Sequence, residues 1–256
     1  MKQVFVPGPL SADSRIWLDE AQAHHLFDVL RTSPKETVRV VADGEVWLGH
    51  VEDKPCLWLY GREMLQKAGP RITLCAALIK SDKFEWMLQK AAELGVTRIV
   101  PFVSRYSIIQ LDDRRALRKM ERWNQILVNA CRQCNRPDLV ELAPVSRLQD
   151  LTGYMSQKNL VAYEKEHSHH LAHYLQDDPA SITCCIGPEG GFDEAEAAWL
   201  EEAGFEPCTL GTRILRAETA ALYVLSCCEY QQHVHEPCQS GVPAGPDGSG
   251  YGQEAA

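Results

Sequence analysis

The 256-residue sequence lacks any apolar run close to the roughly 20 residues that a membrane-spanning helix needs. Its opening stretch, MKQVFVPGPLSADSR, also lacks the apolar region of a secretory signal peptide. We therefore expect a cytoplasmic protein that makes no membrane contact. Ten cysteines are present, but in a large chain without an export signal we expect reduced thiols.

No lysine follows Gly187, which excludes a common class of phosphate loop. A Walker loop needs Gly-x-x-x-x-Gly-Lys-Ser/Thr, and the segment CCIGPEGGF over residues 184–192 also lacks the Gly-x-Gly-x-x-Gly spacing of dinucleotide loops. Glu189 stands where phosphate oxygens need N–H donors. The loop favours a ligand whose reacting part is neutral or cationic, although a plain connection between strand and helix would also use glycines.

The chain has no overall positive charge, since its formal net charge is −9. Between Arg62 and Arg147, however, 16 Lys and Arg stand against 9 Asp and Glu, so this stretch carries +7 and the remainder −16. A basic middle segment can contact nucleic-acid phosphates. On its own, the mixed pattern LDDRRALRKMERW is more typical of a solvated helix surface.

The first 68 residues read as short strands, which predicts a small β-barrel. Strand formers cluster in SRIWL, ETVRVVA, EVWLGHVE and CLWLYG, between turn signals such as ADGE. One helix interrupts them in DEAQAHHLFDVLR, where Leu26, Val29 and Leu30 share a face.

Residues 70–235 alternate buried strands with helices, which predicts an α/β domain with a parallel sheet covered on both faces. The boundary is expected near Ala68, Gly69 and Pro70. Residues 236–256 are rich in Gly, Pro and Ser, which predicts a disordered tail.

Two loops are expected to meet at the carboxyl ends of strands, where α/β sheets bind ligands. The glycine loop leads into a helix with Asp193 as its N-cap, Glu196 three residues later and Gly204 as its stop. The second loop, GTRILR, follows the strand residues CTL and precedes the apolar helix ETAALYVLSCC.

The segments IGPEGGF and LGTRILRAETAAL together resemble the signature of the ribosomal RNA small subunit methyltransferase E family, uridine-N3 methyltransferases of the SPOUT superfamily. HHLFDVLR, KSDKFEWMLQKAAELGVTRIVPF and RWNQILVNACRQCNRPDLVEL agree with it, so the resemblance covers about Val4 to Tyr230. It implies a PUA-like β-barrel joined to a SPOUT domain with a C-terminal trefoil knot, working as a homodimer. The implied cofactor is S-adenosyl-L-methionine, and the implied substrate is small-subunit (16S) ribosomal RNA, free or in the assembled subunit.

The resemblance also implies which residues hold the cofactor. They are Ile186, Gly187, Pro188, Glu189, Gly190 and Gly191 in the first loop, and Leu210, Gly211, Ile214, Leu215 and Arg216 in the second.

Methylation at uracil N3 requires loss of the N3 proton, and the resulting anion spreads onto O2 and O4. Arg216 is the candidate for stabilising that charge, Glu218 for taking the proton or orienting the base, and Thr219 for holding a carbonyl or phosphate. Structural alternatives remain open: Glu218 and Thr219 could merely cap the last helix, and Arg216 could pair with Glu189 or Glu218.

Six basic residues are the predicted RNA contacts. They are His25 and Arg31 in the barrel, and Lys80, Lys83, Arg132 and Arg136 in the second domain.

The chain departs from the family pattern at Arg105, Tyr106, Arg132, Asn135 and Ala217, which bears on RNA contact more than on methyl transfer. We expect no metal site, although HSHHLAH contains histidines at i, i+4 spacing. Two other hypotheses remain: a SPOUT methyltransferase for another RNA, and a ribosome-assembly factor that binds RNA without catalysis.

Overall fold

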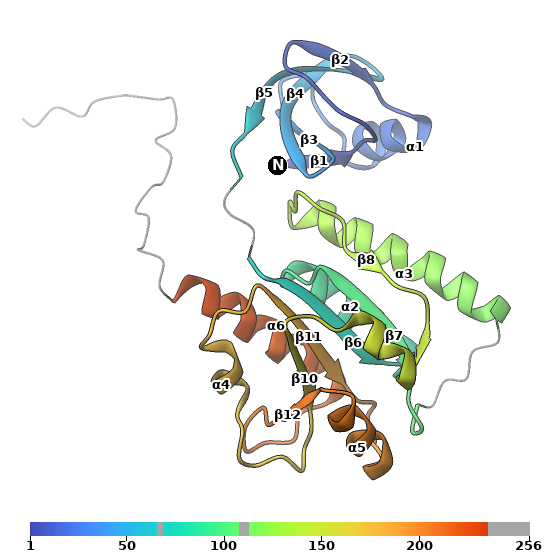
Figure 1. Cartoon of the computed structure of the whole chain (residues 1–256). Helices are drawn as coiled ribbons and strands as arrows, with labels where there is room; N and C mark the ends of the chain where they lie inside the picture. Colours follow the sequence, from blue (N-terminus) through green and yellow to red (C-terminus); the bar gives the residue numbers. More distant parts are fainter. Residues whose placement is uncertain (66–68, 108–112, 235–256) are drawn as a thin grey trace, which may run out of the picture.

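The computed structural model describes residues 1–65, 69–107 and 113–234 (Figure 1). Ala68, at the predicted domain boundary, and the predicted tail over residues 236–256 lie outside these ranges.

The N-terminal part is a five-stranded sheet in the order β1-β3-β4-β5-β2. The strands are β1 (Lys2–Phe5), β2 (Ser14–Trp17), β3 (Val38–Ala42), β4 (Glu45–Asp53) and β5 (Cys56–Glu63), so the four predicted strand segments are confirmed. No pairing joins the two outer strands, β1 and β2, within the described residues, so the predicted closed barrel is not confirmed.

A short helical segment covers this sheet. Asp19 caps α1 (Glu20–Ala23), and the chain then widens into a π-helix, η1 (His24–Val29). Because a π-helix has a longer repeat than an α-helix, the predicted apolar face is wrong in detail. Leu26 and Phe27 enter the core, whereas Val29 is 57% exposed.

The larger part is a parallel sheet in the order β12-β10-β11-β6-β7-β8, with β9 also pairing β7. Its strands are β6 (Arg71–Ala77), β7 (Arg98–Val103), β8 (Glu141–Leu142), β9 (Ser146–Arg147), β10 (Lys158–Ala162), β11 (Ser181–Ile186) and β12 (Glu206–Cys208). The helices are α2 (Ser81–Glu93), α3 (Asp113–Gln133), α4 (Leu171–Leu175), α5 (Glu194–Glu202) and α6 (Ala217–His233), with a 3-10 segment, η2 (Leu148–Tyr154).

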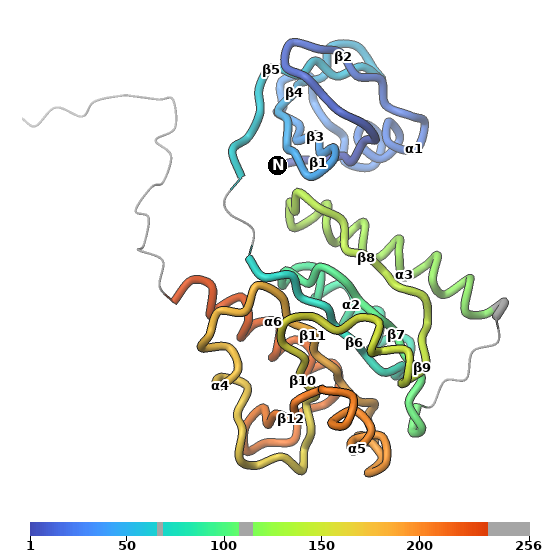
Figure 2. The backbone as a smooth tube through the Cα atoms, in the orientation of Figure 1, coloured from blue at the N-terminus to red at the C-terminus, as the bar shows by residue number. Residues whose placement is uncertain are grey.

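Helices cover both faces of this sheet, as predicted. One core joins Leu74 and Cys184 of the central strands to α2, α3, α4 and α6, including Phe84 and Trp123. The other core joins Cys75 and the opposite strand faces to η2 and α5. The carboxyl ends of β10, β11 and β12 are thereby held in fixed positions, and α5 and β12 lie far from the N-terminal sheet (Figure 2).

Polar contacts join the two parts where β1 and β3 meet the end of α3. Gln3 Nε2 donates to the Arg136 carbonyl at 2.7 Å, and Arg39 donates to the Asn135 carbonyl at 2.6 Å. The same arginine donates to Gln3 Oε1 and pairs with Glu63. Gln3 and Arg39 are buried, so this network fixes the N-terminal sheet against α3.

Candidate functional site

A cavity of about 500 Å³ lies where the loops after β10, β11 and β12 meet the start of α6. Every predicted cofactor residue except Arg216 lines it: Ile186, Gly187, Pro188, Glu189, Gly190, Gly191, Leu210, Gly211, Ile214 and Leu215. Its volume is typical of a site for a small organic ligand. The carboxyl edge of the sheet therefore brings together two loops that are 20 residues apart in the sequence.

Two glycines of the cavity have backbone conformations that side chains rarely adopt. Gly191 has φ of 73°, and a Cβ atom there would lie 2.5 Å from Glu164 Oε1. Gly211 has φ of 120°. Glycine is required at both positions because other residues would strain the loop, and at Gly191 would also fill the space beside the cavity.

The glycine loop is tied to the start of α5. Asp193 and Glu196 form the predicted capping box, and Gly204 follows the helix with φ of 100°. Arg105 and Tyr106, two of the departures from the family pattern, both donate to Asp193 Oδ2 at 3.1 Å. The Ala195 N–H, with these two groups, lowers the pKa of Asp193. The loop after β7 is thus held against the glycine loop.

Lys83, a predicted RNA contact, lies between the glycine loop and the start of α6. Its Nζ atom is 3.9 Å from Glu189 Oε1 and 3.7 Å from Glu218 Oε1. Glu218 is only 8% exposed, and its Oε2 atom is buried without a hydrogen-bond partner. The predicted RNA contact is thus placed to balance the charge of two carboxylates.

Arg216 and Thr219 are exposed at the start of α6, beside the cavity. Arg216 occupies the N-cap position without a side-chain capping bond, and no ion pair of Arg216 is recorded among the described residues. The alternative in which Arg216 pairs with Glu189 or Glu218 therefore does not occur there. Its guanidinium group is available to a ligand.

The predicted RNA contacts fall into different environments. Lys80 is exposed at the N-cap of α2, and Arg31 is exposed after η1. His25 and Arg132 line a second cavity, between η1 and α3.

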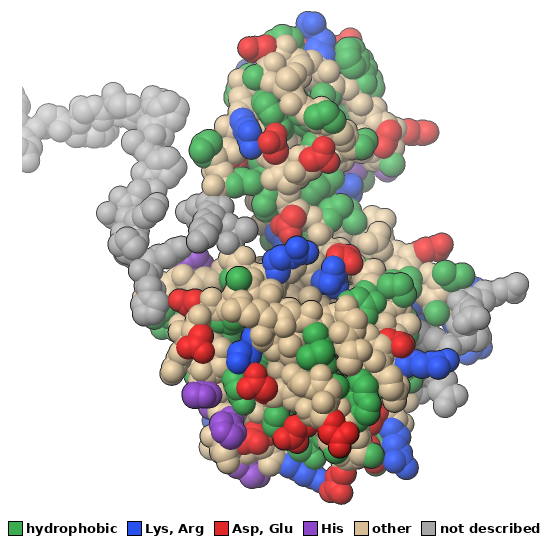
Figure 3. Space-filling model, viewed as in Figure 1, with side chains coloured by type: hydrophobic (Ala, Val, Ile, Leu, Met, Phe, Trp, Pro, Cys, Tyr) green, Lys and Arg blue, Asp and Glu red, His purple; other side chains and the backbone are tan. Residues whose placement is uncertain are grey.

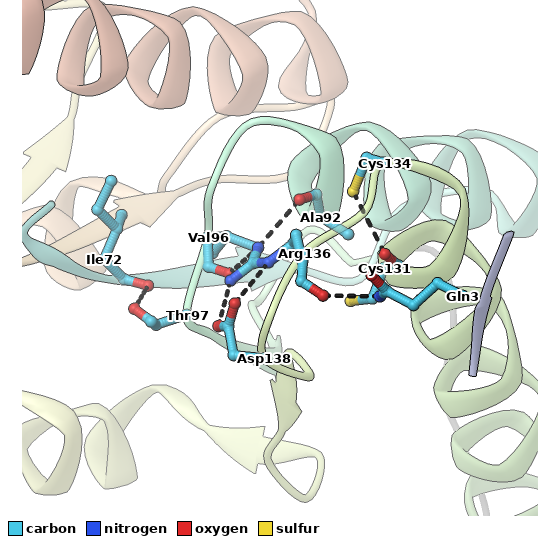
Figure 4. Close-up of polar contacts among 9 residues, drawn as sticks. All are labelled: Gln3, Ile72, Ala92, Val96, Thr97, Cys131, Cys134, Arg136 and Asp138. Atoms are coloured by element: carbon cyan, nitrogen blue, oxygen red, sulfur yellow. Dashed lines mark hydrogen bonds and ion pairs between the residues drawn. The ribbon is translucent and has the colours of Figure 1, made fainter. Parts of the chain in front are cut away.

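Arg136 is the exception, because its side chain is bound within the protein and the predicted RNA contact is not available. Its guanidinium group donates to the carbonyls of Ala92 and Val96 at 2.9 and 2.7 Å and pairs with Asp138 at 2.6 Å (Figure 4). The side chain is 11% exposed. The Nε, Nη1 and Nη2 atoms of Arg136 all donate to acceptors within the protein. Arg136 therefore stabilises the turn after α3 and does not contact RNA.

Sequence reasoning missed the third loop of the cavity. Tyr163, Glu164 and His167 follow β10 and line the cavity, as do Thr209, Thr212 and Arg213 of the second loop. The signal was present, because YEKEH follows the apolar strand NLVA and polar residues at the carboxyl end of a parallel strand face the ligand edge.

Neither a metal cluster nor a membrane-length helix was found in the part of the chain that the structure describes. His170 caps α4, which begins only at Leu171, so most of the histidine-rich segment precedes the helix. Acidic side chains, with several Lys and Arg among them, lie along the lower edge of the space-filling view around α5 (Figure 3).

Comparison with known proteins identifies the family. The model of the RNA methyltransferase domain matches residues 67–229. The ribosomal RNA small subunit methyltransferase E of Bacillus subtilis is 32% identical over 224 residues, covering 82% of this chain and 88% of that protein. The chain belongs to the ribosomal RNA small subunit methyltransferase E family.

Solved structures of similar proteins extend the match over both parts. The family member from Neisseria gonorrhoeae, solved bound to S-adenosyl methionine, has a TM-score of 0.80 at 28% identity, covering 90% of this chain and 97% of that one. A Legionella pneumophila protein described as a putative methyltransferase, in complex with the bound cofactor SAM, has a TM-score of 0.79 at 27% identity, covering 89% and 96%. The chain thus has the α/β methyltransferase fold of this family.

Proposed function

We propose that this protein transfers a methyl group from S-adenosyl-L-methionine to N3 of a uridine in small-subunit ribosomal RNA. The observation that carries the proposal is the cavity in which the GPEGG and LGTRIL loops meet, in a chain of this family. The alternative of a SPOUT enzyme for another RNA differs only in substrate.

The residues present fit this cofactor. The cavity is lined by glycine backbone and apolar side chains, with two carboxylates, Glu164 and Glu189, among its charged groups. Such a lining suits a cationic ligand without phosphates. S-adenosyl-L-methionine supplies, when bound, a methyl group carried on positively charged sulfur.

The chain's own residues handle the charge of the uracil. Arg216, exposed and unpaired at the cavity mouth, donates to O2 or O4 and stabilises the anion that forms when N3 loses its proton. Thr219 lies one turn along α6 and offers a hydroxyl to a carbonyl or phosphate oxygen.

Glu218 either takes the N3 proton or orients the base. Its Oε1 atom is near Lys83, which leaves the buried Oε2 atom as the unsatisfied acceptor. An unpaired buried acceptor costs stability unless a ligand or water satisfies it. Glu218 does not line the cavity, so its proposed role with substrate rests on its place beside Lys83 at the start of α6.

The remaining expectations belong to this proposal. They are a PUA-like character of residues 1–68, a SPOUT domain with a trefoil knot over residues 70–235, a homodimer and a cytoplasmic location. RNA would be gripped by its shape and backbone, which suits a protein with two parts.

Mass spectrometry of RNA nucleosides tests the proposal. Small ribosomal subunits from cells lacking this protein would be incubated with S-adenosyl-L-methionine and the wild-type chain, Arg216→Ala or Arg71→Ala. We expect N3-methyluridine with wild type and a rate at least roughly 100-fold lower with Arg216→Ala. Arg71 is the matched control, because it is exposed at the opposite edge of the sheet.

A non-catalytic RNA-binding factor is the competing function. It predicts that S-adenosyl-L-methionine does not raise the melting temperature, since only a ligand that binds the native state stabilises it. Absence of both this stabilisation and methylation would refute the methyltransferase proposal. Cofactor binding without methylation of these subunits would point to another RNA.

A further inference from the structure

A second cavity, of about 850 Å³, separates the N-terminal part from α3. His25, Val29 and Leu30 of the η1 region form one wall, and Gln125, Asn129 and Arg132 of α3 face them. Figure 1 shows α1 above α3, both far from α5 and β12, and the two cavities share no lining residue. It is therefore distinct from the proposed methyl-transfer site.

Arg132 is the unexplained residue of this cavity. Its Nε atom is buried without a hydrogen-bond partner, and no ion pair of Arg132 is recorded in the described ranges. Burial lowers the pKa of its guanidinium group. By contrast, Arg122 on the same helix and Arg136 one turn later each have a carboxylate partner. A half-buried cation without a partner is unfavourable in the free protein, which indicates an external acceptor.

The neighbouring side chains are polar but mostly uncharged. Gln125, Asn129 and Gln133 follow each other at i, i+4 spacing along α3, and their only recorded contact within the described chain is a 3.5 Å bond from Gln125 to Asn129. Burial and nearby Arg132 lower the pKa of His25, which favours the neutral imidazole. One neutral imidazole and three amides offer both donors and acceptors.

This combination is suited to a nucleotide. Amides and a guanidinium group match the hydrogen-bonding edges of unpaired bases, and arginine also binds phosphate. A free phosphate would use Arg132 and leave the amide row unpaired. Asp19 also lines the cavity and its charge acts on Arg132, but it forms no ion pair with Arg132 in the described ranges, and its Oδ1 accepts from the Gln22 N–H in capping α1.

We propose that this cavity binds an unpaired nucleotide of the RNA substrate, with Arg132 as its main contact and the amide row of α3 facing the base. The proposal rests on the proposed function, since it takes the ligand to be the RNA that is methylated. The Gln3–Arg136 and Arg39–Asn135 contacts hold the two walls in register, so the site is formed before RNA arrives.

The test is RNA affinity of the full chain carrying Arg132→Met. Methionine keeps the unbranched stem of the side chain out to the position of Nε and removes the unpartnered donors, so the melting temperature should be unchanged or higher. Affinity for unmethylated small subunits should fall about tenfold, as expected for loss of one specific contact. Arg122→Met is the matched control, because Arg122 is 69% exposed and paired with Glu85.

Three outcomes overturn the inference. In the first, Arg132→Met binds RNA with an affinity within twofold of wild type. In the second, Arg122→Met loses as much RNA affinity as Arg132→Met, which indicates unspecific electrostatics. In the third, inorganic phosphate stabilises wild type through Arg132 while the RNA affinity of Arg132→Met is unchanged, which indicates an anion site only.

Failure of the inference is distinguishable from failure of the proposed function. If wild type forms N3-methyluridine and Arg132→Met has the same KM for subunits, only the inference fails. If wild type forms none, yet Arg132→Met alone loses RNA affinity, the nucleotide site stands and the methylation proposal falls.

Discussion

Glu218 and Lys83 form a long ion pair beside the proposed methyl-transfer site. The pair bears on the stability of the fold and on the proposed reaction. The 3.7 Å separation of Lys83 Nζ and Glu218 Oε1 balances charge without forming a short hydrogen bond. Lys83 also lies near Glu189, so it connects the first ligand loop with the start of α6. Its role is positioning, and the Oε2 atom of Glu218 is buried without a hydrogen-bond partner.

Replacing Glu218 with glutamine separates the two roles of this carboxylate. Glutamine keeps the shape, so the melting temperature should change little. If Glu218 takes the N3 proton, kcat should fall roughly 100-fold or more, with KM for the cofactor nearly unchanged. Steady-state methylation kinetics provide the measurement. Unchanged kcat with a lower melting temperature would assign Glu218 to structure alone.

The end of α3 shows that two similar arginines of one element can have different roles. Arg132 and Arg136 are four residues apart, but only Arg136 passes beyond the helix end, where the carbonyls of Ala92 and Val96 accept its N–H groups. Asn135, with φ of 58°, turns the chain there. Its carbonyl accepts from Arg39, so this turn also links the two parts.

Arg136→Met should therefore destabilise the fold where Arg132→Met does not. Two carbonyls and Asp138 lose their donors, which should cost roughly 1–3 kcal/mol of unfolding free energy. Urea unfolding of the two variants side by side measures the difference. Equal stability of Arg136→Met and wild type would contradict the structural role assigned to Arg136.

Across the whole molecule, buried thiols make stability depend on alkaline pH. The nine cysteines of the described residues are free. Burial raises the pKa of Cys75, Cys208 and Cys228 to about 12. Because these folded-state pKa values exceed that of an exposed thiol, the stabilisation is complete below about pH 9 and is lost as pH rises from 9 toward 12.

Cys208→Ala tests this dependence. Each such thiol contributes a decline of up to about 1.4 kcal/mol per pH unit above its unfolded pKa. The unfolding free energy of Cys208→Ala should start lower, because of the cavity, but fall less steeply between pH 9 and 10.5 than that of wild type. Parallel slopes would show that Cys208 does not contribute to the alkaline loss.

Features that depend on neighbours along the chain could be predicted from the sequence. Alternating β-formers predicted the strands, Asp193 and Glu196 predicted the cap of α5, and the two glycine-containing loops predicted the cavity at the carboxyl edge. These follow from local propensity and from the direction of parallel strands, which is why they could be read without coordinates.

Which of several similar side chains is paired, buried or free became apparent only in the folded molecule. Lys83, Arg132 and Arg136 are all basic residues of the same charged stretch, yet one balances two carboxylates, one has no partner and one fixes a turn. Charge is a property of the sequence, but partners and desolvation come from residues distant along the chain. The physical reason is that burial and pairing are set by long-range packing, so the use of each charge appears only in the folded molecule.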